Sequence, residues 1–131
     1  MREKHIQKNK AEDHKSNIHI GSKHKGHSIL VSEALYLEAC ENYTFIYLQN
    51  GKRFIGSKPL KHYEDLLNEK DFVRIHRSFL VQLSHIKEYE NKYRLLHLSN
   101  NTMLSVSYRK KSTVNKIINN QEFIKTTKKV A

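Results

Sequence analysis

The densest group of chemically active side chains lies in Phe72–Val81, whose sequence is FVRIHRSFLV. Arg74, His76 and Arg77 stand within four residues of one another, among apolar residues that alternate as in a β-strand. Because successive strand side chains point to opposite faces, the pattern predicts Arg74 and His76 on one face and Arg77 on the other. Cations beside buried aromatic residues are costly unless an anion pairs with them. The segment is therefore either an anion-binding strand or an edge strand whose basic groups pair with carboxylates such as Asp71.

The charge of the chain favours a polyanionic partner. Its 131 residues include 24 Lys or Arg and 13 Asp or Glu, for a formal net charge of +11. Residues 17–120 hold 16 of the basic and 9 of the acidic residues, so most of the excess belongs to the part expected to fold. No stretch is long and apolar enough to insert into a membrane, so nucleic acid is the favoured partner. The alternative is a basic protein whose charge serves solubility alone.

The few cysteine and histidine signals favour no metal or redox chemistry. A single cysteine, Cys40, excludes an intrachain disulfide and fits a reducing compartment, where it is expected to fill a small core space. The N-terminal sequence has no apolar signal region, so the expected location is the cytoplasm. His24 and His27 have a metal-like spacing, but no second ligand pair lies near them. We expect a basic loop there, with neither metal nor cofactor.

Short alternating segments separated by turn residues predict a mainly β domain. Strands and helices do not alternate along the chain, which excludes parallel βαβ architectures. We predict an elongated antiparallel β-sheet domain of about nine or ten short strands with two short helices, the second beginning after Ser107. The expected strands lie at 18–22, 28–31, 35–39, 43–49, 53–57, 72–75, 79–83, 86–90, 93–98 and 102–106.

Local signals predict one hairpin turn and the first helix. Asn50-Gly51 indicates a two-residue hairpin turn suited to positive φ. An amphipathic helix is expected over 59–68, with Glu64 and Asp65 facing solvent and away from any DNA. Its apolar stripe is formed by Leu60, Tyr63, Leu66 and Leu67.

Strand 43–49 is expected to lie at the centre of a sheet. One face carries Thr44, Ile46 and Leu48. The other carries an aromatic row, Tyr43, Phe45 and Tyr47. Since both faces are mostly apolar, the pattern predicts a strand covered on both sides, with the aromatic row largely packed inside. In the preceding strand, one face is expected to carry Leu35, Leu37 and Ala39.

The run Arg74–Val81 resembles the R-x-H-x-S-x-x-V signature of the LytTR family of bacterial DNA-binding domains. Upstream, Leu35–Leu48 (LYLEACENYTFIYL) is similar to the family's "YIEA…NYT" strand pair, and Leu60–Leu67 follows in the expected order. Downstream, Met103–Ser107 (MLSVS) is similar to its closing strand. Several motifs in one order are much harder to match by chance than any single motif.

The resemblance covers about residues 17–120, which leaves 1–16 as a polar tail or linker and 121–131 as a basic tail that frays. It implies small sheets packed in an elongated body that binds double-stranded DNA sequence-specifically, as a transcriptional regulator of the response-regulator type. In such a domain no long recognition helix is available, so strand-connecting loops must meet the DNA. The resemblance implies that three loops contact one face of the duplex and reach successive major grooves.

Five residues are candidates for contacts with DNA bases. By position, Asn42 or Tyr43 matches the first base-contacting site of the family, and the register between the two stays open. Arg77 matches the second, where the guanidinium suits guanine O6 and N7. The third position, often an arginine after a V-S pair, is Tyr108 here, with Arg109 one step later. Arg109 has the better chemistry for that role.

Phosphate contacts are assigned to Arg74, Lys110 and Lys111, which would position the protein without reading sequence. Ser78 is a further candidate, although a hydroxyl bonded to backbone is the competing interpretation. His76 is expected to be a structural histidine bonded to backbone rather than a DNA contact.

Two other functions compete with DNA binding. A nuclease is disfavoured because the sequence has no phosphate-cradling Gly loop, no Ser elbow, no metal-spaced carboxylate pair and only four glycines, so we expect no enzyme. An RNA-binding or ribosome-associated basic β protein is the stronger alternative, and it would expose the aromatic row as a platform for bases.

The domain context is also open. A phosphoacceptor (receiver) domain needs a doubly wound fold, which residues 1–16 are too short to supply. We expect either a stand-alone regulator or the DNA-binding part of a response regulator with an upstream receiver domain. The resemblance implies a homodimer on paired DNA repeats.

Overall fold

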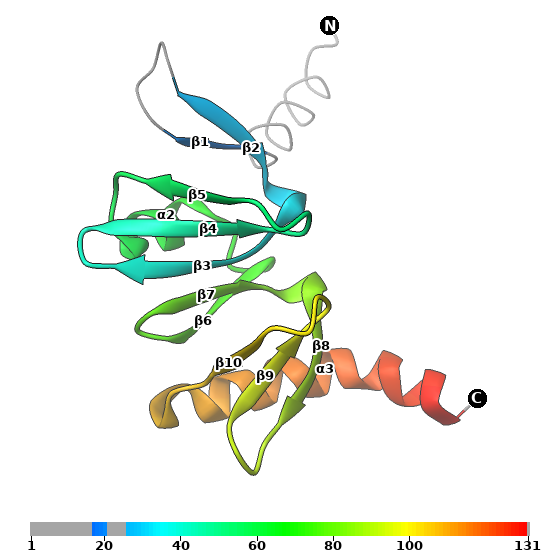
Figure 1. Cartoon of the computed structure of the whole chain (residues 1–131). Coiled ribbons are helices and arrows are strands. Elements are labelled where there is room, and N and C mark those ends of the chain that lie inside the picture. Colours follow the sequence, from blue (N-terminus) through cyan, green and yellow to red (C-terminus); the bar gives the residue numbers. More distant parts are fainter. Residues whose placement is uncertain (1–16, 21–25, 131) are drawn as a thin grey trace, which may run out of the picture.

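The computed structural model describes residues 17–20 and 26–130, with side chains for all of these except His27 and 121–130. The predicted tail 1–16 and His24 lie outside the described residues. Within these residues, ten strands form three antiparallel sheets, which confirms the mainly β prediction. Figure 1 shows the sheets following one another along the long axis of the molecule, as expected for an elongated body.

The strands and helices have the following order. Strands β1 and β2 form a hairpin; β3 to β7 form a five-stranded sheet in the order β5-β4-β3-β7-β6; and β8 to β10 form a three-stranded sheet in the order β10-β9-β8. The strand bounds are β1 Asn17–Ile20, β2 His27–Leu30, β3 Ala34–Cys40, β4 Tyr43–Leu48, β5 Arg53–Gly56, β6 Phe72–His76, β7 Phe79–Gln82, β8 Ile86–Glu90, β9 Leu95–Leu98 and β10 Met103–Ser105. The helices are η1 Val31–Glu33, α2 Leu60–Leu66, η2 Leu83–His85, η3 Tyr108–Lys110 and α3 Lys111–Val130.

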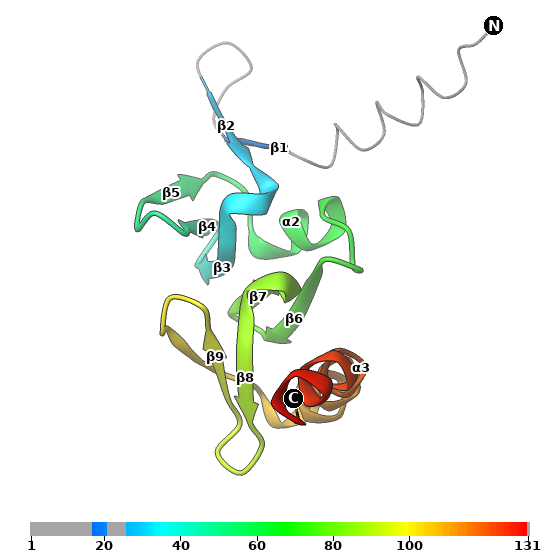
Figure 2. The same cartoon turned by 90° about the vertical axis from the view of Figure 1, so that its right-hand side faces the viewer.

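Two hydrophobic cores hold these layers together. The first lies between the five-stranded sheet, the β1–β2 hairpin and α2, and includes Ile18, Leu37, Ile46, Tyr63 and Leu80. The second joins β3, β6 and β7 of that sheet to the three-stranded sheet and α3, and includes Tyr36, Ile75, Val81, Leu96 and Val114. Figure 2 shows α2 against one face of the five-stranded sheet and α3 beside β6.

A bulge in β3 changes the predicted faces of that strand. The pairing with β4 shifts between Ala34 and Tyr36. Leu35 therefore packs into the second core with Tyr36, whereas Leu37 and Ala39 pack with the first. The prediction that all three apolar residues share one face is wrong, because a bulge inserts one residue and reverses the alternation beyond it.

The aromatic face of β4 is less covered than predicted. Thr44, Ile46 and Leu48 are buried, as expected. On the other face Tyr43 is 51% exposed, and Phe45 and Tyr47 are half-buried. The prediction of a strand covered on both sides is therefore wrong, since α2 covers only one face of the sheet.

The hairpin loop between β4 and β5 is one residue longer than predicted. The backbone N–H of Leu48 donates to the carbonyl of Lys52, which encloses three residues, and Gly51 has φ +91°. A three-residue loop of this kind ends on a residue with positive φ, usually glycine. The Asn50-Gly51 signal thus marked the turn correctly but not its length.

Both helices differ in detail from their predictions. In α2, Leu60, Tyr63 and Leu67 are buried but Leu66 is 57% exposed, so Leu66 is not part of the buried stripe. Helix α3 buries Val114 and Ile118 and continues as helix to Val130, beyond the expected end near residue 120. It is therefore not a short helix.

Candidate nucleic-acid interface

Two of the predicted loops lie at the same end of the five-stranded sheet. Residues 41–42 connect β3 to β4, and residues 77–78 connect β6 to β7. Strands β3 and β7 are antiparallel neighbours with Glu38 opposite Phe79, and the N–H of Ala39 donates to the carbonyl of Ser78 at 2.9 Å. The two turns are thus adjacent, at the left in Figure 1.

The third loop reaches the same end through β6. The N–H of Ser107, directly before η3, donates to the carbonyl of Ile75 at 2.9 Å. Figure 1 shows the chain entering α3 on the side where the other two turns lie. We call residues 41–42, 77–78 and 108–110 together the loop edge. The structure thus brings the three predicted clusters onto one side of the molecule.

The first turn presents its side chains to solvent. Glu41 has φ +55°, a left-handed conformation that turns the chain sharply between the strands. Both candidates for the first base-contacting position, Asn42 and Tyr43, are exposed. Their exposure leaves both available to a ligand.

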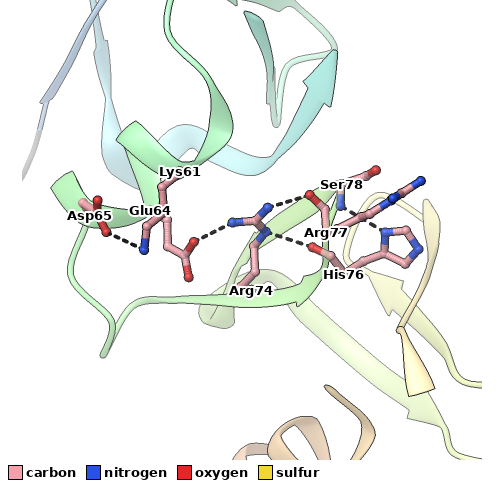
Figure 3. Close-up of polar contacts among 7 residues, drawn as sticks. All are labelled: Lys61, Glu64, Asp65, Arg74, His76, Arg77 and Ser78. Atoms are coloured by element: carbon pink, nitrogen blue, oxygen red, sulfur yellow. Dashed lines mark hydrogen bonds and ion pairs between the residues drawn. The ribbon is translucent and has the colours of Figure 1, made fainter. Parts of the chain in front are cut away.

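The second turn is held by Arg74, which lies on the edge strand β6 (Figure 3). Its Nε donates to the carbonyl of His76 at 2.9 Å, and its Nη2 donates to the carbonyl of Arg77 at 2.5 Å. Its Nη1 pairs with Oε1 of Glu64 on α2 at 2.5 Å. Arg77 itself is exposed.

Two predictions about this segment are wrong. Glu64 is half-buried and pairs with Arg74, so it does not face solvent away from the loop edge. This pair confirms the expectation that a cation of an edge strand meets a carboxylate, with Glu64 in the place of Asp71. Arg74 and His76 also point to opposite faces, because a bulge between them pairs Arg74 with Leu80 of the first core and His76 with Phe79.

His76 has the backbone hydrogen bond expected of a structural histidine. Its Nδ1 accepts from the N–H of Ser78 at 3.0 Å, and its ring centroid lies 5.4 Å from that of Phe79. Since Nδ1 accepts, the neutral ring carries its proton on Nε2. The imidazole thereby holds the turn formed by residues 77–78 through a hydrogen bond to its backbone.

The third loop exposes one aromatic and one cationic side chain. Tyr108 is 75% exposed, and Arg109 beside it is also exposed. The side-chain oxygen of Ser107 accepts from the N–H of Lys110 at 3.3 Å and caps the helical turn. Lys110 and Lys111 are half-buried.

Sequence reasoning missed two cations near the loop edge. Arg94 has φ +52°, donates from Nε to the carbonyl of Val106 at 3.1 Å, and places its guanidinium 5.9 Å from the Tyr108 ring centroid. Lys61 of α2 lines the cavity beside the second and third loops, and its Nζ pairs with Asp65 at 3.1 Å. The sequence carried no signal for Arg94, since the pairing of β9 with β10 and the bond from the N–H of Val106 to the carbonyl of Arg94 bring it beside the third loop.

The second and third loops border an open cavity of about 600 Å³. Most of the side chains that line it are cationic, so the cavity favours an anion over a neutral ligand. The lining residues are Lys61, Glu64, Arg74, His76, Arg77, Ser107, Arg109 and Lys110.

The aromatic row of β4 does not form a flat platform. Phe45 and Tyr47 meet edge to face with their ring planes at 64°, and Tyr47 stacks on Tyr36 with ring centroids 4.5 Å apart. Burial, above all, raises the pKa of Tyr36 to about 12 and raises the pKa of Tyr47 as well. The Tyr47 hydroxyl also donates to Oε1 of Glu38 at 3.0 Å. These rings stabilise the sheet, and the arrangement gives no support to base stacking on RNA.

Comparison with known proteins decides the family. A sequence model of the LytTr DNA-binding domain matches residues 24–119. The chain belongs to the LytTR family. This LytTR domain shares its fold with a solved LytTr DNA-binding domain from Bacillus cereus, with a TM-score of 0.68 and 28% sequence identity. The match covers 79% of this chain and 97% of that one. The family consists of DNA-binding regulatory domains and is not an enzyme family.

The LytTR domain is also similar to transcriptional regulatory protein LytR from several strains of Staphylococcus aureus. The sequences are 36% identical over 55 residues, which cover 42% of this chain and 22% of the relative. The matched segment therefore spans about a fifth of the length of these curated relatives. Among the described residues, no helix has the length and apolarity to cross a membrane, and no cluster of His, Cys, Asp and Glu could hold a metal ion.

Proposed function

We propose that this LytTR domain binds double-stranded DNA sequence-specifically, with the loop edge in the major grooves, and acts as a transcriptional regulator in the cytoplasm. The observation that carries the proposal is the backbone linkage of the three loops, from Ala39 to Ser78 and from Ser107 to Ile75. It places three loops with exposed side chains on one side of a positively charged molecule, which supports the proposal.

Base contacts are assigned to one residue in each loop. Arg77 is exposed while its own carbonyl is held by Arg74, so its guanidinium is free to present two parallel donors to guanine O6 and N7. Such a bidentate contact discriminates by about 1–3 kcal/mol. In the first loop, Asn42 or Tyr43 contacts a base. In the third loop Arg109 takes the base contact, and the cations of Arg94 and Lys111 each lie 5.9 Å from the Tyr108 ring centroid.

Phosphate contacts are assigned to Lys110 and Lys111, with Arg74 and Ser78 as further candidates. Lys110 lines the cationic cavity between the second and third loops. A phosphate of the DNA backbone that separates two grooves would lie there. Such contacts fix orientation and carry no sequence information.

The similar proteins support a proposal about the longer protein in which this domain works. The Staphylococcus aureus relatives are transcriptional regulatory proteins about five times longer than the matched segment, so we propose that this domain works with an upstream receiver domain. We also propose that two copies of the domain bind paired DNA repeats as a homodimer.

Selection of bound duplexes from a random pool tests the proposal. We expect the wild-type chain to select a defined motif and Arg77→Ala to lose preference at one or two positions, mainly guanine. Arg53→Ala is the matched control. Arg53 is exposed, and its place opposite Tyr47 in the β4–β5 pairing puts its backbone at the end of the sheet away from the first two loops. A wild-type chain that selects no motif, or that prefers single-stranded RNA in competition, would refute the proposal.

A further inference from the structure

We propose that Glu64 of α2 is a positioning residue for base recognition, acting through Arg74 on the turn that carries Arg77. The inference rests on the role proposed above for Arg77. Glu64 itself has no part in the contacts assigned to DNA, and its charge repels phosphate.

The geometry forms a continuous chain of contacts from helix to turn (Figure 3). Glu64 Oε1 holds Nη1 of Arg74, while Nε and Nη2 of the same guanidinium hold the carbonyls of His76 and Arg77. A guanidinium is planar and rigid, so holding its Nη1 on a carboxylate restricts the direction of its remaining donors. Helix α2 thereby sets where the Arg77 backbone lies.

The burial of this ion pair separates it from ordinary surface pairs. The side chains of Arg74 and Glu64 are 19% and 31% exposed, whereas the Lys61–Asp65 pair on the same helix is 71% and 64% exposed. Exposed pairs contribute little to stability, and a partly buried charge left without its partner is costly. Without Glu64, Arg74 would be released toward solvent or phosphate and would leave the turn carbonyls.

Charge alone and the positioning role predict opposite effects. Glu64 is a carboxylate lining a cavity that is otherwise mostly cationic, so removing its charge should strengthen binding to any duplex. If Glu64 positions Arg77, its removal should weaken binding to the selected motif, because the free turn must be ordered each time it binds. The ratio of non-specific to specific dissociation constants separates the two.

The test measures this ratio by fluorescence anisotropy at fixed salt for Glu64→Ala, Glu64→Gln and Asp65→Ala. We expect Glu64→Ala to lower the ratio about two- to tenfold, the range for ordering one side chain. Glu64→Gln keeps an acceptor for Arg74 and should lower the ratio less, and it carries the test if Glu64→Ala does not fold. Asp65→Ala removes an equal charge from the same helix without touching the turn, and should leave the ratio unchanged.

A double-mutant cycle shows whether Glu64 acts through Arg77. In the Arg77→Ala background, Glu64→Ala should change the ratio less than twofold. An unchanged or raised ratio for Glu64→Ala or Glu64→Gln alone, or an equal loss in both backgrounds, would overturn the positioning role while leaving the proposed function intact. If Arg77→Ala itself leaves the ratio unchanged, the role of Arg77 fails and the positioning role fails with it.

Discussion

The backbone N–H of Ala39 donates a 2.9 Å hydrogen bond to the carbonyl of Ser78, which ties the end of β3 to the turn that carries Arg77. Asn42 follows Ala39 by three residues. The hydrogen bond between Ala39 and Ser78 therefore places the first loop beside the second through the main chain. A second main-chain bond, from Ser107 to Ile75, sets the third loop against β6. Main-chain bonds therefore place the three loops beside one another, while the side chain of Arg74 holds the turn that carries Arg77.

Lys110→Ala should weaken binding to all duplexes alike. Lys110 is assigned to a phosphate, and a phosphate contact releases counterions without reading bases. We expect the slope of log binding constant against log salt concentration to fall by about one unit. Titrations of the selected motif and of a scrambled duplex at several salt concentrations provide the measurement. A loss confined to the selected motif would contradict the assignment.

Arg109→Ala and Tyr108→Phe should have different effects on sequence preference. If Arg109 contacts a base, its truncation should abolish preference at one position and cost about 1–3 kcal/mol on the preferred duplex. Tyr108→Phe keeps the ring near the cations of Arg94 and Lys111, so it should leave the preference as in wild type. Binding-site selection with both variants gives the answer. The reverse pattern would assign the third groove to Tyr108.

Gly56→Ala should destabilise the domain. A Cβ at this position would lie 2.9 Å from Cζ of Tyr63 and would overlap its hydroxyl, and Tyr63 is buried between α2 and the sheet. Overpacking of this kind costs about 1–3 kcal/mol. Urea denaturation measures the free energy of unfolding. Repeating the substitution in a Tyr63→Phe background, where the hydroxyl is gone, should reduce the cost, and equal costs in both backgrounds would count against the steric explanation.

The domain should lose stability at alkaline pH, in part through Tyr36. Burial, followed by the nearby Tyr47 and Glu38, raises the pKa of Tyr36 from 10.0 to about 12. A group whose pKa is raised on folding stabilises fully below its unfolded pKa, and that contribution is lost as pH rises from about 10 to about 12. At pH 11 the loss is about 1 kcal/mol. Urea denaturation at pH 8 and pH 11 should show a smaller decline for Tyr36→Phe than for wild type. The exposed Tyr93→Phe is the control, and identical declines for all three proteins would refute the prediction.

The sequence predicted the elements well because their signals are local. Alternation, turn residues and the stripe of α2 gave the antiparallel β class, and the order of motifs gave the family. The bulges in β3 and β6 were not predictable, because each depends on an inter-strand register that alternation does not encode. Their consequence is large at Arg74, which faces α2 instead of sharing a face with His76.

Burial of the candidate site was harder to predict than its position. Tyr43, Phe45 and Tyr47 look like core residues in isolation, but their exposure depends on which face α2 covers. The partner of Arg74 was equally hidden, since Glu64 is ten residues away and meets it because α2 packs on the face of the sheet toward which Arg74 points. Loop positions came from sequence, whereas the contacts that fix the loops came from tertiary structure.

Guanine methylation interference on the selected duplex tests the central claim most directly. If the three loops bind one duplex together, wild-type protein should give three interfering blocks in successive major grooves on one face of the DNA. Asn42→Ala, Arg77→Ala and Arg109→Ala should each remove a different block and leave the other two. A single block, or blocks spread around the duplex, would contradict a shared loop edge.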